Sequence, residues 1–212
     1  MGAGTTAQHW DAIYASDGAE HVSWAQRDPG RSLAAVDALE VDHTDEVIDV
    51  GGGTSVFAGA LAQRGFTDIT VLDLSLEAIN AGINRYAADR ITWQPGDVLD
   101  WRAKRQYRLW HDRAVFHFLT DAPDRQRYRN VLNAALAPGG AIIIETFAPD
   151  GPDRGSRLPV VRYRPTSLAH ELGPGLAPIA SGDYEHQTPS GAIQAFIWLA
   201  LRKDSRDSTP RA

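Results

Sequence analysis

The sequence has no cysteine among its 212 residues, which excludes disulfides, thiolate catalysis and any metal site built on cysteine. It has no apolar run long enough to cross a bilayer, and its start lacks the basic-then-apolar pattern of a signal peptide. The formal net charge is −6 with no long basic run, which disfavours binding to a nucleic-acid backbone. The histidines show no metal-ligand spacing. We therefore expect a cytoplasmic protein that binds no membrane, nucleic acid or metal.

Short apolar runs alternate with segments of helical periodicity over most of the chain. Five strands are expected, at Glu46–Val50, Ile69–Ser75, Ile91–Asp97, Tyr107–Arg113 and Gly140–Phe147. This alternation predicts the α/β class, with a single Rossmann-like, doubly wound parallel sheet. Two more strands, Leu176–Gln187 and Ala192–Ala200, flank the turn TPSG and predict an antiparallel C-terminal hairpin, which makes seven strands. Ligands of such sheets lie beyond the carboxyl ends of the strands.

Three consecutive glycines follow the first strand, in VIDVGGGTS (Val47–Ser55). Glycine lets backbone N–H groups approach a ligand closely, so this turn predicts a nucleotide-like ligand. The dinucleotide fingerprint G-x-G-x-x-G fits at Gly51 and Gly53, but Val56 stands at the third glycine, which disfavours NAD or FAD. A nicotinamide-dependent oxidoreductase and a turn that binds nothing remain alternatives.

The same turn, read from Asp49, resembles the acidic-x-G-x-G motif of class I S-adenosylmethionine-dependent methyltransferases, with Ser55 replacing a further glycine. An acidic residue at the end of the second strand, the motif GDVLD, the motif LAPGG and the terminal hairpin also fit this family, from Trp10 to Ala200. The resemblance implies S-adenosylmethionine as cofactor and S-adenosylhomocysteine as product. Its implied cofactor contacts are Asp49, Gly51, Gly52, Gly53, Ser55, Asp73, Leu74, Asp97, Val98 and His111.

Two further segments, His9–Gln26 and Trp110–Asp121, are similar to a branch of uncharacterised bacterial methyltransferases and to eukaryotic elongation-factor lysine methyltransferases. This similarity implies that the N-terminal segment covers the cofactor, with Trp10, Tyr14 and Trp24 as the contacting side chains. The alternative is that these aromatic residues simply dock an N-terminal helix onto the domain.

Methyl transfer from a sulfonium is an in-line displacement, for which a protein supplies alignment, exclusion of water and, where needed, a base. The acceptor is expected beyond the fourth strand, which makes His117, Asp112 and Arg113 candidate catalytic residues. A packing role for His117 and a structural Asp112–Arg113 ion pair are the alternatives.

The acceptor itself stays open between a small molecule and a protein lysine, and a non-catalytic module that binds the cofactor is a further alternative. Arginines after the fifth strand suit an anionic acceptor, Glu145 suits a cationic one, and solvated surface charge is the simpler interpretation of any single arginine. The candidate acceptor-binding residues are Phe116, Glu145, Arg157, Arg162 and Tyr163.

The whole chain is expected to form a single methyltransferase domain, residues 1–212. Its expected parts are an N-terminal cofactor-covering segment (1–28), a nucleotide-binding core (29–147), a substrate loop or lid (148–175), a terminal hairpin (176–201) and a disordered tail (202–212).

Overall fold

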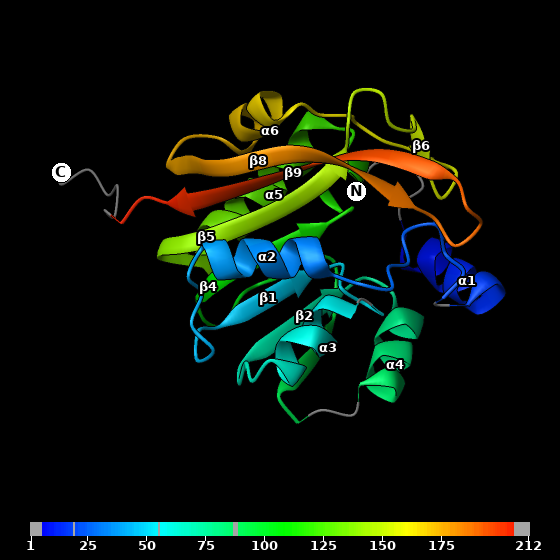
Figure 1. Cartoon of the computed structure of the whole chain (residues 1–212), viewed down its shortest axis with the longest axis horizontal. Helices are drawn as coiled ribbons and strands as arrows, with labels where there is room; N and C mark the ends of the chain where they lie inside the picture. Colours follow the sequence, from blue (N-terminus) through cyan, green and yellow to red (C-terminus); the bar gives the residue numbers. More distant parts are fainter. Residues whose placement is uncertain (1–5, 19, 55, 87–88, 206–212) are drawn as a thin grey trace.

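The computed structural model describes residues 6–18, 20–54, 56–86 and 89–205, which build a seven-stranded sheet with helices on both faces (Figure 1). The strands lie in the order β3-β2-β1-β4-β5-β9-β8. The first five of these are parallel, whereas β9 is antiparallel to both β5 and β8. Their bounds are β1 Val47–Val50, β2 Ile69–Asp73, β3 Ile91–Pro95, β4 Tyr107–Arg113, β5 Leu136–Phe147, β8 Leu176–Gln187 and β9 Ile193–Lys203.

Successive side chains of a strand point to opposite faces of the sheet, so both faces are apolar and both are covered by helices. Helices α2, α3 and α4 pack on one face through residues such as Val36, Phe57 and Ile79. Helices α5 and α6 pack on the other face through residues such as Tyr128 and Leu168. The α/β class, the doubly wound sheet and the antiparallel terminal hairpin are therefore confirmed. The helix bounds are α1 Ala7–Asp17, α2 Gly30–Ala38, α3 Val56–Gln63, α4 Leu76–Arg85, α5 Ala122–Ala135 and α6 Pro165–Leu172, with a 3₁₀ turn, η1, at Phe116–Phe118.

Two strand boundaries differ from the sequence prediction by three residues or more, and the others agree within two residues. β5 begins at Leu136 rather than Gly140, because Leu136 pairs with Tyr107 and a register shift follows before the next pair. β9 continues through Arg202 and Lys203, which the prediction assigned to a disordered tail; Arg202 donates hydrogen bonds to the carbonyls of Gly139 and Leu39. Ser55 and residues 206–212 lie outside the described residues.

The segment after β5 is more regular than its Pro- and Gly-rich sequence predicts. A two-stranded hairpin forms there, from β6 (Arg154–Gly155) and β7 (Leu158–Pro159). Helix α2 has no counterpart among the predicted elements. In the part of the chain that the structure describes, no helix is both long and apolar enough to span a membrane.

Candidate active site at the carboxyl ends of the strands

The glycine turn after β1 leaves no room for side chains. Gly51 has φ +66°, and a β-carbon there would lie 2.1 Å from Val115 Cγ2. A β-carbon on Gly52 would lie 2.4 Å from Asp49 Oδ2, and Gly53 also has a positive φ, of +28°. Real β-carbons do not come this close to other atoms, so each of the three positions requires glycine for a physical reason.

A cavity opens beside this turn, at the edge where the parallel strands end. We call it the strand-end cavity; it holds about 920 Å³ of space free of protein atoms, including open solvent at its mouth. One wall is formed by Gly51, Asp73, Leu74, Gly96, Asp97 and Val98. The far end is lined by Arg113, His117, Phe118, Phe147 and Phe196. The structure thus brings Gly51, Asp73, Leu74, Asp97 and Val98 together on one wall, as their motifs predict.

Asp73 lies at the end of β2 and is almost completely buried in this wall. Its Oδ1 accepts a hydrogen bond from Ser75 N–H at 2.8 Å. Burial raises the pKa of the Asp73 carboxyl to about 7, the Ser75 bond opposes this shift, and the charges of Asp49 and Asp11 add to it. Two ligand hydroxyls donating to this carboxyl would favour its ionised form. The residue therefore suits a ribose.

The N-terminal segment contributes to the lining of the cavity. Trp10, Tyr14 and Trp24 all line the cavity, and the Trp10 ring lies edge-on to those of Trp24 and Phe118, 5.4 and 5.1 Å between centroids. The Trp24 indole N–H donates to Tyr14 Oη at 3.2 Å. Asp11 anchors the segment, because its carboxylate accepts a hydrogen bond from Ser75 Oγ at 2.6 Å. The three aromatic residues, Trp10, Tyr14 and Trp24, thus pack within the segment and also line the cavity.

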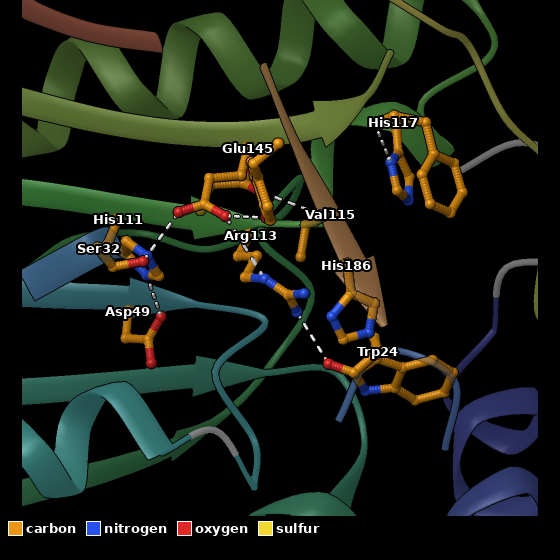
Figure 2. A network of polar contacts seen from close by, with 12 residues as sticks. Trp24, Ser32, Asp49, His111, Arg113, Val115, His117, Glu145 and His186 are labelled. Carbon is orange, nitrogen blue, oxygen red and sulfur yellow. Dashed lines mark hydrogen bonds and ion pairs between the residues drawn. The ribbon is translucent and has the colours of Figure 1, made fainter. Parts of the chain in front are cut away.

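The backbone after this helix is held to the sheet at two neighbouring carbonyls. Arg113 Nη1 donates to Trp24 O at 2.9 Å, and His186 Nε2 donates to Ser23 O at 2.8 Å (Figure 2). Arg113 comes from the end of β4 and His186 from β8. The terminal hairpin and the central sheet therefore fix the covering segment together.

On the face of the sheet covered by α2, five polar side chains form a continuous chain of contacts, drawn in Figure 2. Asp49 Oδ1 lies 2.7 Å from His111 Nδ1, and His111 Nε2 lies 3.0 Å from Ser32 Oγ. Ser32 Oγ donates to Glu145 Oε1 at 2.9 Å, and Glu145 Oε2 lies 3.5 Å from Arg113 Nε. Asp49 and His111 line a second cavity, between the N-terminal segment and the β8–β9 turn, rather than the strand-end cavity.

Arg113 lines both cavities, and its side chain is 10% exposed. Its Nη2 is buried without a hydrogen-bond partner among the described residues. A buried donor without a partner is costly, so this N–H group suits an anionic or carbonyl oxygen of a ligand.

Asp112, predicted to be catalytic, faces the other side of the sheet. It accepts hydrogen bonds from Tyr128 Oη at 2.6 Å and from Val115 N–H at 3.0 Å. Burial raises the pKa of the Asp112 carboxyl to about 6, against these hydrogen bonds. The structure thus does not pair Asp112 with Arg113: Asp112 fixes the backbone that carries Val115 over Gly51.

His117 lines the strand-end cavity with its ring stacked on Phe147, 4.5 Å between centroids. Burial lowers the pKa of His117 to about 3, and the positive charge of Arg113 adds to this shift, so the ring is neutral near pH 7. The N–H of Phe147 points at His117 Nδ1, 3.3 Å away, which places the ring proton on Nε2. A neutral ring in this tautomer is a hydrogen-bond donor toward the cavity rather than a base there.

The other predicted acceptor-binding residues lie outside the cavity lining. Phe116 and Tyr163 are buried in the core, 5.7 Å apart between ring centroids, and Glu145 is fully buried. Arg157 is exposed, and its backbone carbonyl accepts a hydrogen bond from Arg154 Nη2. Arg162 Nη1 donates to Gly151 O at 3.2 Å. From the same loop, Gly155 and Ser156 do line the cavity; Gln194 and Phe196 of the hairpin join them, and no sequence signal had singled these four out.

Comparison with known proteins gives this site its identity. Residues 47–140, which hold the glycine turn, Asp73 and Asp97, match the family described as a methyltransferase domain. Over 156 residues the chain is 24% identical to human EEF1A lysine methyltransferase 2, a match that spans 66% of this chain and 66% of the human protein. These matches support a class I S-adenosylmethionine-dependent methyltransferase.

Solved structures agree with this methyltransferase fold. An S-adenosylmethionine-dependent methyltransferase from Anabaena variabilis superposes with a TM-score of 0.74 at 14% identity, covering 93% of this chain and 94% of that one. The Burkholderia thailandensis 1,6-didemethyltoxoflavin-N1-methyltransferase superposes with a TM-score of 0.65 at 18% identity, covering 91% and 81%. The latter holds bound 1,6-didemethyltoxoflavin and S-adenosylhomocysteine.

The residues of this methyltransferase fit its cofactor. The glycine cradle that no β-carbon could enter and the buried, unpartnered Arg113 N–H are the features that a nucleoside with an amino-acid tail requires. Within the described residues, no group of three or more His, Asp or Glu side chains could hold a metal ion.

Proposed function

We propose that the protein transfers the methyl group of S-adenosylmethionine to a small, flat and largely apolar acceptor. The observation that carries this proposal is the lining of the far end of the strand-end cavity. Phe118, Phe147 and Phe196 line it with the neutral His117, and Arg113 supplies its charge. The carboxylates in the described lining of the cavity are Asp73 and Asp97, which the cofactor is proposed to occupy. Such a pocket suits an aromatic or heteroaromatic compound better than a lysine ammonium.

The relatives support two acceptor classes. The human relative is named as a lysine methyltransferase, whereas the Burkholderia neighbour is named as a 1,6-didemethyltoxoflavin-N1-methyltransferase. The carboxylate suggested for a cationic acceptor, Glu145, is fully buried and engaged by Ser32 and Tyr184. Because Glu145 does not line the cavity, the small-molecule class is the better supported one.

In this proposal each wall of the cavity has a task. Asp73 receives the ribose hydroxyls, Asp97 and Val98 hold the adenine, and the amino-acid tail runs over Gly51 toward Arg113. The cofactor supplies an electrophilic methyl group on a sulfonium. Trp10 and Trp24 exclude water from the space between methyl group and acceptor, which aligns the displacement and prevents side reactions.

His117 has a positioning task in this scheme rather than that of a base. Its Nε2–H can donate to an oxygen or ring nitrogen of the acceptor, which orients the nucleophilic atom toward the methyl group. A nucleophile that is already unprotonated or acidic near pH 7 then needs no proton acceptor on the protein.

The acceptor class can be tested with radiolabelled S-adenosylmethionine. The enzyme is incubated separately with a protein-free metabolite extract and with a dialysed protein lysate, and Asp73→Ala serves as the background. Label in the metabolite extract alone supports the proposal. Label in lysate protein, removed by protease but not by dialysis, would establish a protein acceptor instead.

A further inference from the structure

The polar chain below the glycine turn joins parts of the molecule that are far apart in sequence. Its members are Asp49 of β1, His111 and Arg113 of β4, Glu145 of β5 and Ser32 of α2 (Figure 2). The sheet register explains the arrangement, since Asp49 is the neighbour of His111 and Arg113 is the neighbour of Glu145. Ser32 is 113 residues from Glu145 and bridges the two pairs from above the sheet.

The polar chain from Asp49 to Glu145 has more hydrogen-bonded contacts than its neutral groups have protons to donate. Three contacts need one proton each: Asp49 to His111, His111 to Ser32, and Ser32 to Glu145. A serine hydroxyl supplies one proton and a neutral imidazole supplies one. With both carboxylates ionised, a third proton is required, because otherwise one contact of 3.0 Å or less would join two acceptors.

The surroundings decide where this third proton resides. Tyr184 Oη donates to Glu145 Oε2 and the Arg113 guanidinium lies beside it, so the Ser32 hydroxyl supplies the proton of the Ser32–Glu145 contact. Between Asp49 and His111 the imidazole is the more basic group. The other group packed on the His111 ring is the uncharged Phe57, stacked at 3.9 Å between centroids.

The three contacts are therefore all satisfied together when both His111 ring nitrogens carry protons. The buried set then contains two carboxylates, Asp49 and Glu145, and two cations, His111 and Arg113. Its net charge is zero, as burial of four such groups requires.

The two ends of this polar chain reach the glycine turn and the covering segment. At one end the Asp49 carboxylate fills the space beneath Gly52, and at the other Arg113 holds the backbone carbonyl of Trp24 in the covering segment. Ser32 is the bridge between the two ends.

We propose that Ser32 and His111 are positioning residues that couple the glycine turn to the covering segment, with His111 as a permanent imidazolium. They fix the Asp49 carboxylate below the turn and, through Glu145, the guanidinium of Arg113 above it. This inference rests on the proposed cofactor site. It adds to the site two residues outside the lining of the strand-end cavity, Ser32 of helix α2 and His111 of β4.

The first test is Ser32→Ala, with S-adenosylhomocysteine binding followed by calorimetry and stability by thermal unfolding. Loss of one hydrogen bond to a charged group is expected to weaken binding about tenfold. The matched control is Ser181→Ala, an exposed serine of β8, which is expected to bind like the wild type. A Ser32→Ala protein that loses stability but binds with wild-type affinity would show a purely structural role and overturn the proposal. Failure of the wild type itself to bind would instead refute the cofactor site.

The second test needs no destabilised variant for its readout. Nitrogen NMR of the wild-type protein reports the protonation of each histidine ring, and His111→Asn identifies the signal, with His170→Asn on the exposed face of α6 as control. At about pH 7 both His111 ring nitrogens are expected to carry protons, since the polar chain requires an imidazolium. A His111 ring with a single N–H would overturn the proposal.

Discussion

Val115 packs directly against Gly51: a β-carbon on Gly51 would lie 2.1 Å from Val115 Cγ2. This contact exists because Asp112 accepts the Val115 N–H and Ala114 takes a φ of +67°, which turns the chain back over the glycine turn. The contact closes the cavity at the point where the cofactor's amino-acid tail is proposed to pass.

Gly51→Ala is therefore expected to destabilise the protein by about 2 kcal/mol or more, since it combines a steric clash with a strained φ. S-adenosylhomocysteine affinity should fall at least about tenfold, because Val115 or the turn must move. Urea unfolding and calorimetry measure the two effects.

The control for this variant is Gly175→Ala. Gly175 also has a positive φ, +82°, but a β-carbon there meets no atom within 4 Å. It should lose about 1 kcal/mol from the backbone conformation alone and keep its affinity for S-adenosylhomocysteine. Equal affinity losses in the two variants would contradict a specific role for the Gly51–Val115 contact.

The raised pKa of Asp73, about 7, predicts opposite pH trends for stability and binding. The folded protein favours the neutral carboxyl, so the stability that this preference contributes is fully present below the ordinary value of 3.8 and is lost as the pH rises through about 7. Cofactor affinity should rise severalfold over the upper part of that range, because ribose hydroxyls donate to the ionised carboxylate.

Asp73→Asn supplies the comparison for both trends. The stability difference between wild type and variant, from urea unfolding at about pH 4 to about pH 8, should shift against the wild type as the pH rises. Identical pH dependence of the two proteins in unfolding and in S-adenosylhomocysteine calorimetry would show that Asp73 does not titrate in this window.

His117 is expected not to titrate between about pH 5 and about pH 8, because burial and Arg113 lower its pKa to about 3. The carbon-bound ring protons of His117, assigned with His117→Asn, should keep constant NMR shifts through this range. A midpoint inside the range would restore His117 as a candidate general base.

The sequence predicts the positions of the strands well, but it predicts less well where β5 begins and in which direction side chains point after β4. Strand positions follow from short β-branched runs, whereas the start of β5 depends on pairing with Tyr107, which no local pattern encodes. The 3₁₀ turn after β4 also escapes prediction. It sends Phe116 into the core and His117 toward the cavity, although both are adjacent members of one aromatic run.

Some residues of the candidate site can likewise be predicted from the sequence, and others cannot. Asp73 and Asp97 end strands with recognisable motifs, and the structure places them on one wall of the cavity. Ser32 could not be found, because its chemistry comes from Glu145, 113 residues away, and from a helix without a motif.

A structure of the complex with S-adenosylhomocysteine tests the central claim most directly. The account predicts the adenine beside Asp97 and Val98, the ribose hydroxyls on Asp73, and the amino-acid tail passing Gly51 toward Arg113. A ligand that lies wholly in the second cavity, between the N-terminal segment and the β8–β9 turn, would contradict it.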